Sequence, residues 1–480
     1  MNELTISIDV KDSKPLYEQI YEYIKGEIQG GSISFHEKLP STRALARHLQ
    51  ISRSTVDAAY EQLMSEGYIE AVPCRGYFVS GIDELYQFTE TVSEPVKIMQ
   101  EKKDRREDYR IDFSPNGIDL DSFPYNTWRK LTRNTLQYDN KELFQPGAAE
   151  GEPEFRTAIC KYLHQARGVR CRPEQIIVGA GNDYLMMLLS RIIGKDHVIA
   201  MENPTYRHAY GTFTGLSYEV VTVNMDKNGI LVKELEKTNA DIAYVMPSHQ
   251  YPLGIVMPIK RRLELLRWAA AGSEKYIIED DYDSEFRYKG KPIPALQGFD
   301  SNDRVIYTGT FSKSIAPAIR VSYMVLPEKL LEKYRENSEF YTSTVSRIDQ
   351  TLINSFLSEG YFERHLNKMR AIYKNKHDVL LQEMKKLSTV CTVSGENAGV
   401  HILVSFHNGL QEREIIERAA SRKIKVYGLS EYYIKSSPGE SATIIMGYAN
   451  LKEDEIREAV SELAEVWRQG RAGYCSRYDQ

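Results

Sequence analysis

The stretch Gly309-Thr-Phe-Ser-Lys313-Ser-Ile-Ala-Pro-Ala-Ile-Arg320 places one lysine among small hydroxylated residues, with an arginine seven positions further along the chain. Upstream, the apolar run Tyr276-Ile-Ile-Glu279 leads into Asp280, Asp281 and Tyr282. Hydroxyl groups and an arginine bind phosphate, and a buried carboxylate bonds a pyridine nitrogen. This combination predicts that Lys313 holds the aldehyde cofactor pyridoxal 5′-phosphate (PLP) as an imine.

The loop around Lys313 supplies the predicted phosphate ligands Thr310, Ser312 and Arg320. A lone lysine would be interpreted as a solvated surface residue, but this one follows a predicted strand and has these neighbours. We expect the like charge of the arginine to lower the pKa of Lys313, which favours the neutral, nucleophilic amine.

The acidic pair Asp280-Asp281 is the predicted partner of the pyridine nitrogen. Tyr282 follows two residues after Asp280, so the two side chains share one face of a strand. The tyrosine hydroxyl would then reach the ring oxygen O3′, and we therefore favour Asp280 over Asp281.

Two further segments contribute weaker candidates. Gly181 and Asn182 end a predicted strand and open a helix, and backbone N–H groups at a helix N-terminus bind phosphate. Tyr206, beside the turn at Asn203-Pro204, is placed to stack on the pyridine ring, although core packing is the commoner role for a tyrosine.

Residues 111–480 alternate helical patterns with apolar strands. This alternation predicts an α/β fold with a large, mainly parallel, helix-covered sheet and a smaller C-terminal α/β lobe from about residue 330. The strand candidates are 175–178, 197–200, 242–245, 276–279 and 305–307.

Residues 1–80 predict a separate winged helix-turn-helix: three helices followed by a β-hairpin around Pro73-Cys-Arg-Gly76. Residues 81–110 have no sustained apolar period and are interpreted as a linker.

The basic residues of this module are concentrated where a helix-turn-helix meets DNA. Residues 36–55 hold four Lys/Arg and one acid, and the N-terminal end of the third helix is the part that reads base edges. We predict contacts to operator DNA from the second helix, the start of the third helix and the hairpin tip, by Arg43, Ser52, Arg53, Thr55, Arg75 and Gly76.

Bulk composition narrows the remaining classes. A net charge of −5 argues against indiscriminate binding to nucleic acid or membranes. The five cysteines are scattered without C-x-x-C spacing, so we predict reduced thiols, no disulfide framework and no metal site. We find no signal peptide and no apolar run long enough to cross a membrane, and expect a cytoplasmic protein.

Leu39-Pro-Ser-Thr-Arg43-Ala-Leu-Ala46, Ser52-Arg-Ser-Thr-Val56 and Glu66-Gly-Tyr-Ile69 resemble the GntR family of bacterial regulators. The lysine and aspartate motifs, with Pro247-Ser-His-Gln-Tyr-Pro-Leu-Gly254, resemble fold-type I aminotransferases. The combination is similar to the MocR/GabR-type subfamily of GntR regulators. The resemblance implies a head-to-tail homodimer with winged helices at its periphery, and an amino-acid or amine effector.

Two positions depart from the family pattern. Tyr251 stands where catalytic aminotransferases usually carry an asparagine that bonds O3′, so we expect altered cofactor electronics. In the γ-aminobutyrate-sensing type, arginines hold the effector carboxylate, and the matching positions here are His208 and Glu431. Glu431 would repel a carboxylate, so we predict a different effector. Arg207 is the alternative carboxylate ligand if the alignment shifts by one residue.

Taken together, the sequence predicts a PLP-dependent transcriptional regulator. Its DNA-binding output would switch when an amino compound forms an external aldimine with PLP in place of Lys313. We expect no physiological turnover beyond a residual aminotransferase half-reaction. The alternative is a working aminotransferase that carries a DNA-binding module, and a third possibility is an operator-binding protein in which PLP is only structural.

Overall fold

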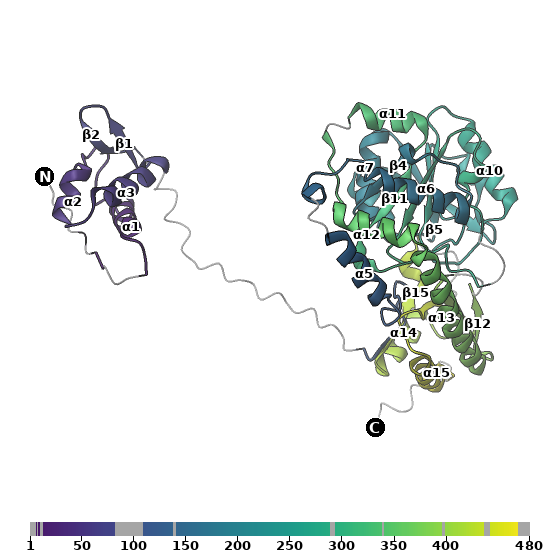
Figure 1. Cartoon of the computed structure of the whole chain (residues 1–480). Coiled ribbons are helices and arrows are strands. Elements are labelled where there is room, and N and C mark those ends of the chain that lie inside the picture. Colours follow the sequence, from purple (N-terminus) through teal and green to yellow (C-terminus); the bar gives the residue numbers. More distant parts are fainter. Residues whose placement is uncertain are drawn as a thin grey trace, which may run out of the picture. The chain divides into compact units, whose positions relative to one another are not determined.

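A computed structural model describes residues 6, 8–9, 13–81, 109–137, 141–288, 293–337, 340–395, 399–435 and 442–468. The chain forms two compact units, Met1–Arg105 and Arg106–Gln480 (Figure 1). The predicted linker lies almost wholly outside the described residues, as does Cys475. Each unit is considered by itself below.

The N-terminal unit is a winged helix-turn-helix, as the sequence predicts. Its elements are α1 (Leu16–Gln29), α2 (Thr42–His48), α3 (Arg53–Ser65), β1 (Ile69–Val72) and β2 (Gly76–Val79). The apolar residues Ile20, Ile24 and Ile28 of α1 recur every fourth position and are all buried, and α1 packs against α3.

Serine side chains fix where the second and third helices begin. Ser41 Oγ accepts a hydrogen bond from the Ala44 amide at 3.2 Å, and Ser52 Oγ accepts one from the Thr55 amide at 3.2 Å. Such N-caps typically stabilise a helix by about 1 kcal/mol. The wing is antiparallel, with Ile69 opposite Val79 and Val72 opposite Gly76.

The second unit is built on an eight-stranded sheet in the order β4-β11-β10-β9-β8-β5-β6-β7. The five strands from β10 to β6 run parallel to one another, whereas β11 and β7 are antiparallel to their neighbours. The bounds are β4 (Ile176–Gly179), β5 (Val198–Asn203), β6 (Glu219–Asp226), β7 (Gly229–Ile230), β8 (Ile242–Val245), β9 (Tyr276–Asp281), β10 (Val305–Thr310) and β11 (Ser322–Val325).

Helices cover both faces of this sheet because its strands are apolar on both sides. Ile278 and Tyr244 pack on one face with residues of α7, α8 and α11, while Ile277 and Ala243 pack on the other with residues of α9 and α10. The helices of this lobe are α5 (Tyr125–Leu136), α6 (Pro153–Arg167), α7 (Asn182–Ile193), α8 (Arg207–Gly215), α9 (Val232–Leu235), α10 (Ile259–Ala270) and α11 (Glu328–Glu336).

The smaller lobe has its own antiparallel sheet, β12-β13-β16-β15, and is drawn at the lower end of this unit in Figure 1. A parallel pair, β3 with β14, attaches the first residues of the unit to this lobe. The remaining elements of this unit are β3 (Ile111–Asp112), α12 (Arg347–Ser358), α13 (Tyr361–Met384), β12 (Cys391–Ser394), β13 (His401–Phe406), α14 (Glu412–Ser421), β14 (Ile424–Lys425), β15 (Tyr427–Gly428), β16 (Thr443–Gly447) and α15 (Glu453–Trp467).

The α/β architecture and the five strands predicted from sequence are present. Strands β6 and β11 were not predicted from the sequence. The small lobe was predicted to begin at about residue 330, whereas Leu330, Leu331 and Tyr334 of α11 pack in the core of the large sheet. None of the described helices is long and apolar enough to cross a membrane.

Candidate cofactor and DNA-binding sites

The predicted cofactor residues meet at the carboxyl ends of the parallel strands. β9 ends at Asp281 and β10 at Thr310, so the segments that follow both strands lie at one edge of the sheet. This edge is where α/β proteins bind ligands. The cavity there is lined by Asn116, Asn182, Asp183, Tyr206, Met246, Tyr251, Asp280, Tyr282, Thr310, Ser312, Lys313 and Arg320.

The Lys313 amine donates hydrogen bonds to the Pro115 carbonyl at 3.0 Å and to Asn116 Oδ1 at 3.4 Å. Burial lowers the pKa of Lys313 to about 8, while the Asp283 carboxylate limits that fall. The predicted direction of the shift is right, but its predicted cause is wrong: desolvation of the ammonium, not the like charge of Arg320, disfavours the protonated form.

Asp280 and Asp281 point to opposite sides of β9, as consecutive strand residues must. Asp280 accepts hydrogen bonds from the Tyr244 hydroxyl and, at 3.4 Å, from Asn182 Nδ2, and it lines the cavity. Burial raises the pKa of Asp280 to about 6.

Asp281 instead belongs to a buried ion pair. Its Oδ2 accepts from Arg167 Nε at 2.8 Å and from the Tyr307 hydroxyl at 2.6 Å. With its oxygen committed to these partners, Asp281 has a structural role. The geometry therefore supports the preference for Asp280 at the cofactor.

Positive charge and hydrogen-bond donors lie around Gly181 and the start of α7. Arg320 lies over Gly181, the residue that precedes α7, and its Nη2 is 3.3 Å from Asp183 Oδ2. The first amides of α7, from Asn182 onward, have no partner within the helix and carry the positive end of its dipole. Thr310 Oγ1 accepts from the Ser312 amide at 3.1 Å, which holds the two hydroxyl residues together.

Aromatic side chains form one wall. Tyr251 meets Tyr206 edge to face, with ring centroids 5.8 Å apart, and meets Tyr282 in the same way at 5.7 Å. The Tyr282 hydroxyl is hydrogen-bonded to His249 Nδ1 at 2.9 Å, and the same nitrogen lies 3.0 Å from Asp283. This series of hydrogen bonds was not predicted from the sequence, because His249 and Asp283 lie on segments that are brought together only by the order of strands in the sheet.

The predicted effector residues lie beside this cavity and do not line it. Arg207 is exposed and donates to the Tyr433 carbonyl at 3.0 Å, and His208 and Glu431 are exposed as well. Tyr432, the neighbour of Glu431, contacts a residue that lines the cavity: its hydroxyl accepts a hydrogen bond from the Tyr251 hydroxyl at 3.0 Å.

Two other residues of the site were missed, and the fold explains both: Asn116 lines the cavity, and Tyr244 lies behind the lining and bonds Asp280. Tyr244 lies on β8, whose neighbour in the sheet is β9, so its hydroxyl reaches Asp280. Asn116 follows the first strand of the unit and reaches Lys313 across the chain. Strand order supplies both contacts, and sequence spacing carries no signal for either.

The donor set of the cavity fits PLP. A guanidinium, two hydroxyl residues and a helix N-terminus are available for a phosphate. A carboxyl group is available for the pyridine nitrogen, and an amine of lowered pKa lies in the same cavity for the aldehyde. A side chain at Gly181 would fill the space that Arg320 occupies, so the glycine is part of the fit.

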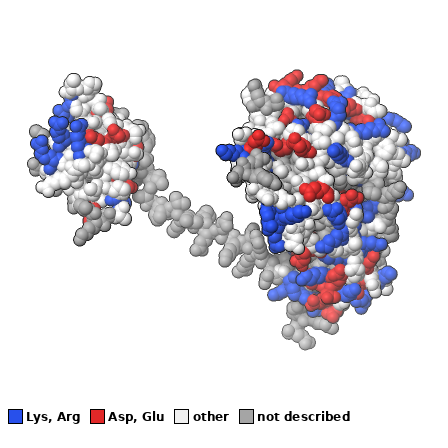
Figure 2. Space-filling view, viewed as in Figure 1, with Lys and Arg blue, Asp and Glu red and all other residues white. Residues whose placement is uncertain are grey.

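The N-terminal unit carries a basic face, and Figure 2 shows its Lys and Arg side chains gathered on one side. Lys14 and Lys25 are ion-paired with Glu22 and Glu66. Among the described residues of this unit, the remaining cations are exposed, and only Arg53 has an ion-pair partner, Asp57 at 3.3 Å. They are Lys38, Arg43, Arg47, Arg53 and Arg75.

The predicted DNA contacts lie on the elements expected of them. Arg53 is the first residue of α3, and Ser52 caps that helix, with its Oγ 2.8 Å from Thr55 Oγ1. Arg75 lies at the turn of the wing, followed by Gly76 with φ of +111°. Arg43 lies in the first turn of α2.

Comparisons with known proteins assign a family to each of the two units. The family of class I and II aminotransferases matches residues 111–463, and the gntR family of bacterial regulatory proteins matches residues 16–79. The HTH-type transcriptional regulator YdeL of Bacillus subtilis is 40% identical over 95% of this chain and 97% of its own. The probable rhizopine catabolism regulatory protein MocR of Rhizobium meliloti is 30% identical over 94% of this chain and 93% of its own.

Solved structures agree on the fold of the second unit. A multiple substrate aminotransferase from Thermococcus profundus superposes with a TM-score of 0.67, covering 81% of this chain and 95% of its own at 24% identity. Pyrococcus horikoshii kynurenine aminotransferase gives the same TM-score at 23% identity, covering 81% of this chain and 94% of its own.

Proposed function

Because the chain belongs to the MocR/GabR-type subfamily of GntR transcriptional regulators, with PLP as its cofactor, we propose that an amino compound switches its affinity for operator DNA. When bound, PLP supplies an aldehyde carbon that exchanges between the Lys313 amine and the amine of a ligand. The effector is therefore an amino acid or an amine. It would act on a transcriptional regulator that works in the cytoplasm.

One observation carries this proposal: the segment that holds the Lys313 amine is the same segment that continues toward the DNA-binding unit. Pro115 and Asn116 contact the amine, and the chain immediately before them leads through residues 81–110 to the winged helix. A change in the bonding of the Lys313 amine would therefore affect Pro115 and Asn116, in the segment that anchors the linker to the second unit.

That anchor is held by the small lobe. The Arg110 amide donates to the Lys423 carbonyl at 2.8 Å, and the Gly447 amide donates to the Phe113 carbonyl at 2.9 Å. Asn450 Nδ2 also donates to the Asp112 carbonyl at 3.0 Å. We propose that a change at the Lys313 amine alters the contacts between segment 110–117 and the small lobe, and that the ligand acts by favouring one arrangement of these contacts.

The ligand amine is expected to enter near the aromatic wall, where Tyr251 and Tyr432 join the large lobe to loop 429–434. Arg207 lies at this loop and is our candidate for a ligand carboxylate, in place of Glu431. We further propose that the protein works as a head-to-tail dimer, so that two winged helices address two half-sites.

The test uses purified full-length protein with PLP and an operator selected from random-sequence DNA. Candidate amines are added while cofactor absorbance and DNA binding are followed together. An amine that changes both, without release of a keto acid, supports the regulator. Continuous keto-acid production supports the alternative, a working aminotransferase, and absorbance changes that never alter DNA affinity would contradict the proposed switch.

A further inference from the structure

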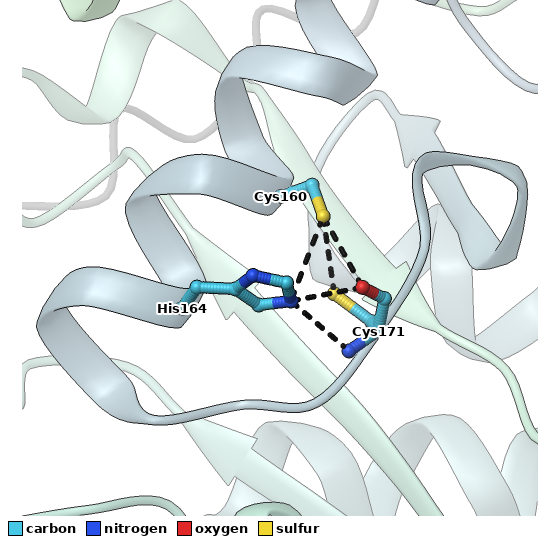
Figure 3. A group of neighbouring side chains, drawn as sticks. All are labelled: Cys160, His164 and Cys171. Atoms are coloured by element: carbon cyan, nitrogen blue, oxygen red, sulfur yellow. Dashed lines mark hydrogen bonds between the residues drawn. The ribbon is translucent and has the colours of Figure 1, made fainter.

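Three metal-ligating side chains lie together at the C-terminal end of α6, away from the cofactor cavity. Cys160 and His164 are one helical turn apart, so they share a face of the helix. The chain then turns back at Gly168, whose φ is +65°, and brings Cys171 against them. Figure 3 shows the two helix residues directed at Cys171.

The two distances from Cys160 Sγ to the other ligand atoms are close to those of a tetrahedral zinc site. The two Sγ atoms are 3.9 Å apart, Cys160 Sγ is 3.8 Å from His164 Nε2, and all three ligand atoms lie within 4.8 Å of one another. Zinc bonds of about 2.3 Å to sulfur and about 2.0 Å to nitrogen, at tetrahedral angles, separate two sulfurs by roughly 3.8 Å and sulfur from nitrogen by roughly 3.5 Å. The two distances from Cys160 Sγ need shifts of a few tenths of an ångström, and the distance from Cys171 Sγ to His164 Nε2, at most 4.8 Å, has to shorten by up to about 1.3 Å.

A disulfide fits this geometry less well. Its sulfurs must approach to about 2.0 Å, so the Cys160–Cys171 pair would have to close by nearly half of its present separation of 3.9 Å. It would also give His164 no role, although its Nε2 lies 3.8 Å from Cys160 Sγ and within 4.8 Å of Cys171 Sγ. The geometry therefore favours a metal over a cross-link.

We propose that Cys160, His164 and Cys171 bind one zinc ion per chain. Two thiols and an imidazole are soft and borderline ligands of the kind Zn²⁺ prefers. Each thiol loses its proton to solvent as its S–Zn bond forms, and the two thiolates neutralise the ion. His164 contributes the lone pair of Nε2, which gives up its present contacts with the Cys171 carbonyl oxygen at 2.9 Å and the Cys171 amide at 3.4 Å when it binds the ion.

The site is accessible and leaves one position open. Cys160 and Cys171 are buried, but His164 is exposed, beside a surface hollow lined also by Gly168, Arg170 and Arg172. Within the described ranges, no fourth His, Cys, Asp or Glu joins the group. Solvent would take the fourth position, as it does in zinc sites with three protein ligands.

No metal site was predicted from the sequence, because the cysteines are scattered without C-x-x-C spacing and the fold alone brings Cys160, His164 and Cys171 together. Arg167 lies between His164 and Cys171 and donates a hydrogen bond to Asp281. Asp281 is next in sequence to Asp280, the carboxylate that we assign to the cofactor. Zinc would hold both ends of the turn that carries this arginine. We therefore expect zinc binding to raise the melting temperature of the protein, independently of any amine effector.

The experiment measures zinc on the full-length, untagged protein with PLP bound and a non-thiol reductant present. After chelation and removal of the chelator, we expect the wild type to take up one zinc ion per chain. Cobalt in place of zinc should give thiolate-to-metal absorbance. Cys160→Ser, Cys171→Ser and His164→Gln should each weaken zinc binding roughly tenfold or more, since even outer-shell partners of metal ligands account for that much.

Cys391→Ser is the matched control, since Cys391 is a buried thiol outside the group. It should keep wild-type zinc affinity, and circular dichroism with PLP absorbance reports whether each variant is folded. Absence of stoichiometric zinc from reduced wild-type protein would overturn the proposal, as would zinc binding that survives all three substitutions. A Cys160–Cys171 disulfide that forms in air even with zinc present would assign the pair to redox chemistry instead.

Discussion

The guanidinium of Arg320 occupies the space where a side chain at Gly181 would begin: a Cβ there would lie 2.3 Å from Arg320 Nη2. Gly181 also has φ of +92°, a conformation that glycine adopts without strain. Two requirements thus meet at one residue, and together they bring the arginine against the N-terminus of α7. This juxtaposition makes the proposed phosphate site.

Gly181→Ala should therefore weaken PLP binding. The methyl group would displace Arg320 and strain the backbone, and we expect the dissociation constant for PLP to rise roughly tenfold or more, equivalent to over about 1.4 kcal/mol. Gly194→Ala is the control, because Gly194 ends the same helix with φ of +89° and has open space around its Cα. It should lower the melting temperature but leave PLP affinity unchanged. Equal PLP affinity in both variants would show that Arg320 is not a phosphate ligand.

Asp280→Asn should separate cofactor binding from stability. Burial raises the pKa of Asp280 to about 6, above its unfolded value near 3.8, so the ionised form destabilises the folded apo-protein at pH 8. We expect the asparagine variant without PLP to be more stable by up to about 3 kcal/mol at pH 8 and to bind PLP more weakly. The stability gain should shrink as the pH falls from about 6 toward 4, where the wild-type carboxyl is protonated in the folded state. Chemical denaturation across this pH range measures it.

Asp281→Asn is the matched comparison on the same strand. It leaves Arg167, which is only 2% exposed, without its carboxylate partner. Loss of one member of a buried ion pair typically costs about 3 kcal/mol or more. We expect this variant to unfold at lower denaturant concentration with or without PLP. If Asp281→Asn proved as stable as Asp280→Asn, the division of roles along β9 would be wrong.

The extent to which sequence predicts this site depends on how each residue is brought there. Lys313, Arg320 and Asp280 stand in local motifs, and their side chains follow from strand alternation and the loop after β10. Residues such as Tyr244 and Asn116 reach the site only through the order of strands in the sheet, which spacing along the chain does not encode. The lowered pKa of Lys313 was foreseen, but its cause is burial, a property of the folded state.

The rate at which PLP is incorporated should depend on pH through Lys313. Its pKa of about 8 means that the neutral amine increases as the pH rises from 7 to 9. We expect imine formation on the apo-protein, followed by absorbance after rapid mixing, to accelerate through pH 8 and then level off. Lys313→Ala should give no imine absorbance while remaining folded. A borohydride-reducible PLP adduct on another lysine in that variant would show that Lys313 is not the residue that binds PLP.

Operator binding should depend on the basic face of the N-terminal unit. Arg53→Ala is expected to weaken binding by about 1–3 kcal/mol if the arginine reads a base. Asp57→Ala should act in the opposite direction, because it frees Arg53 of its ion pair and removes a negative charge near the DNA. Lys14→Ala, on an ion-paired lysine before α1, serves as the charge control and should change affinity little. Fluorescence anisotropy at fixed salt measures all three, and equal effects of Arg53→Ala and Lys14→Ala would argue against base reading.

Asn116→Ala should uncouple the two units. Asn116 Oδ1 accepts a hydrogen bond from the Lys313 amine at 3.4 Å, and Asn116 belongs to the segment that leads to the linker. Its loss removes one contact between that segment and the amine. We expect the variant to bind PLP and to show the wild-type absorbance change with an effector amine, while the effector changes DNA affinity less than in the wild type. Asn134→Ala, on the helix after this segment, is a control outside the cavity lining. An effector response in Asn116→Ala equal to that of the wild type would mean that the signal leaves the cavity by another route, with loop 429–434 at Tyr432 as the next segment to test.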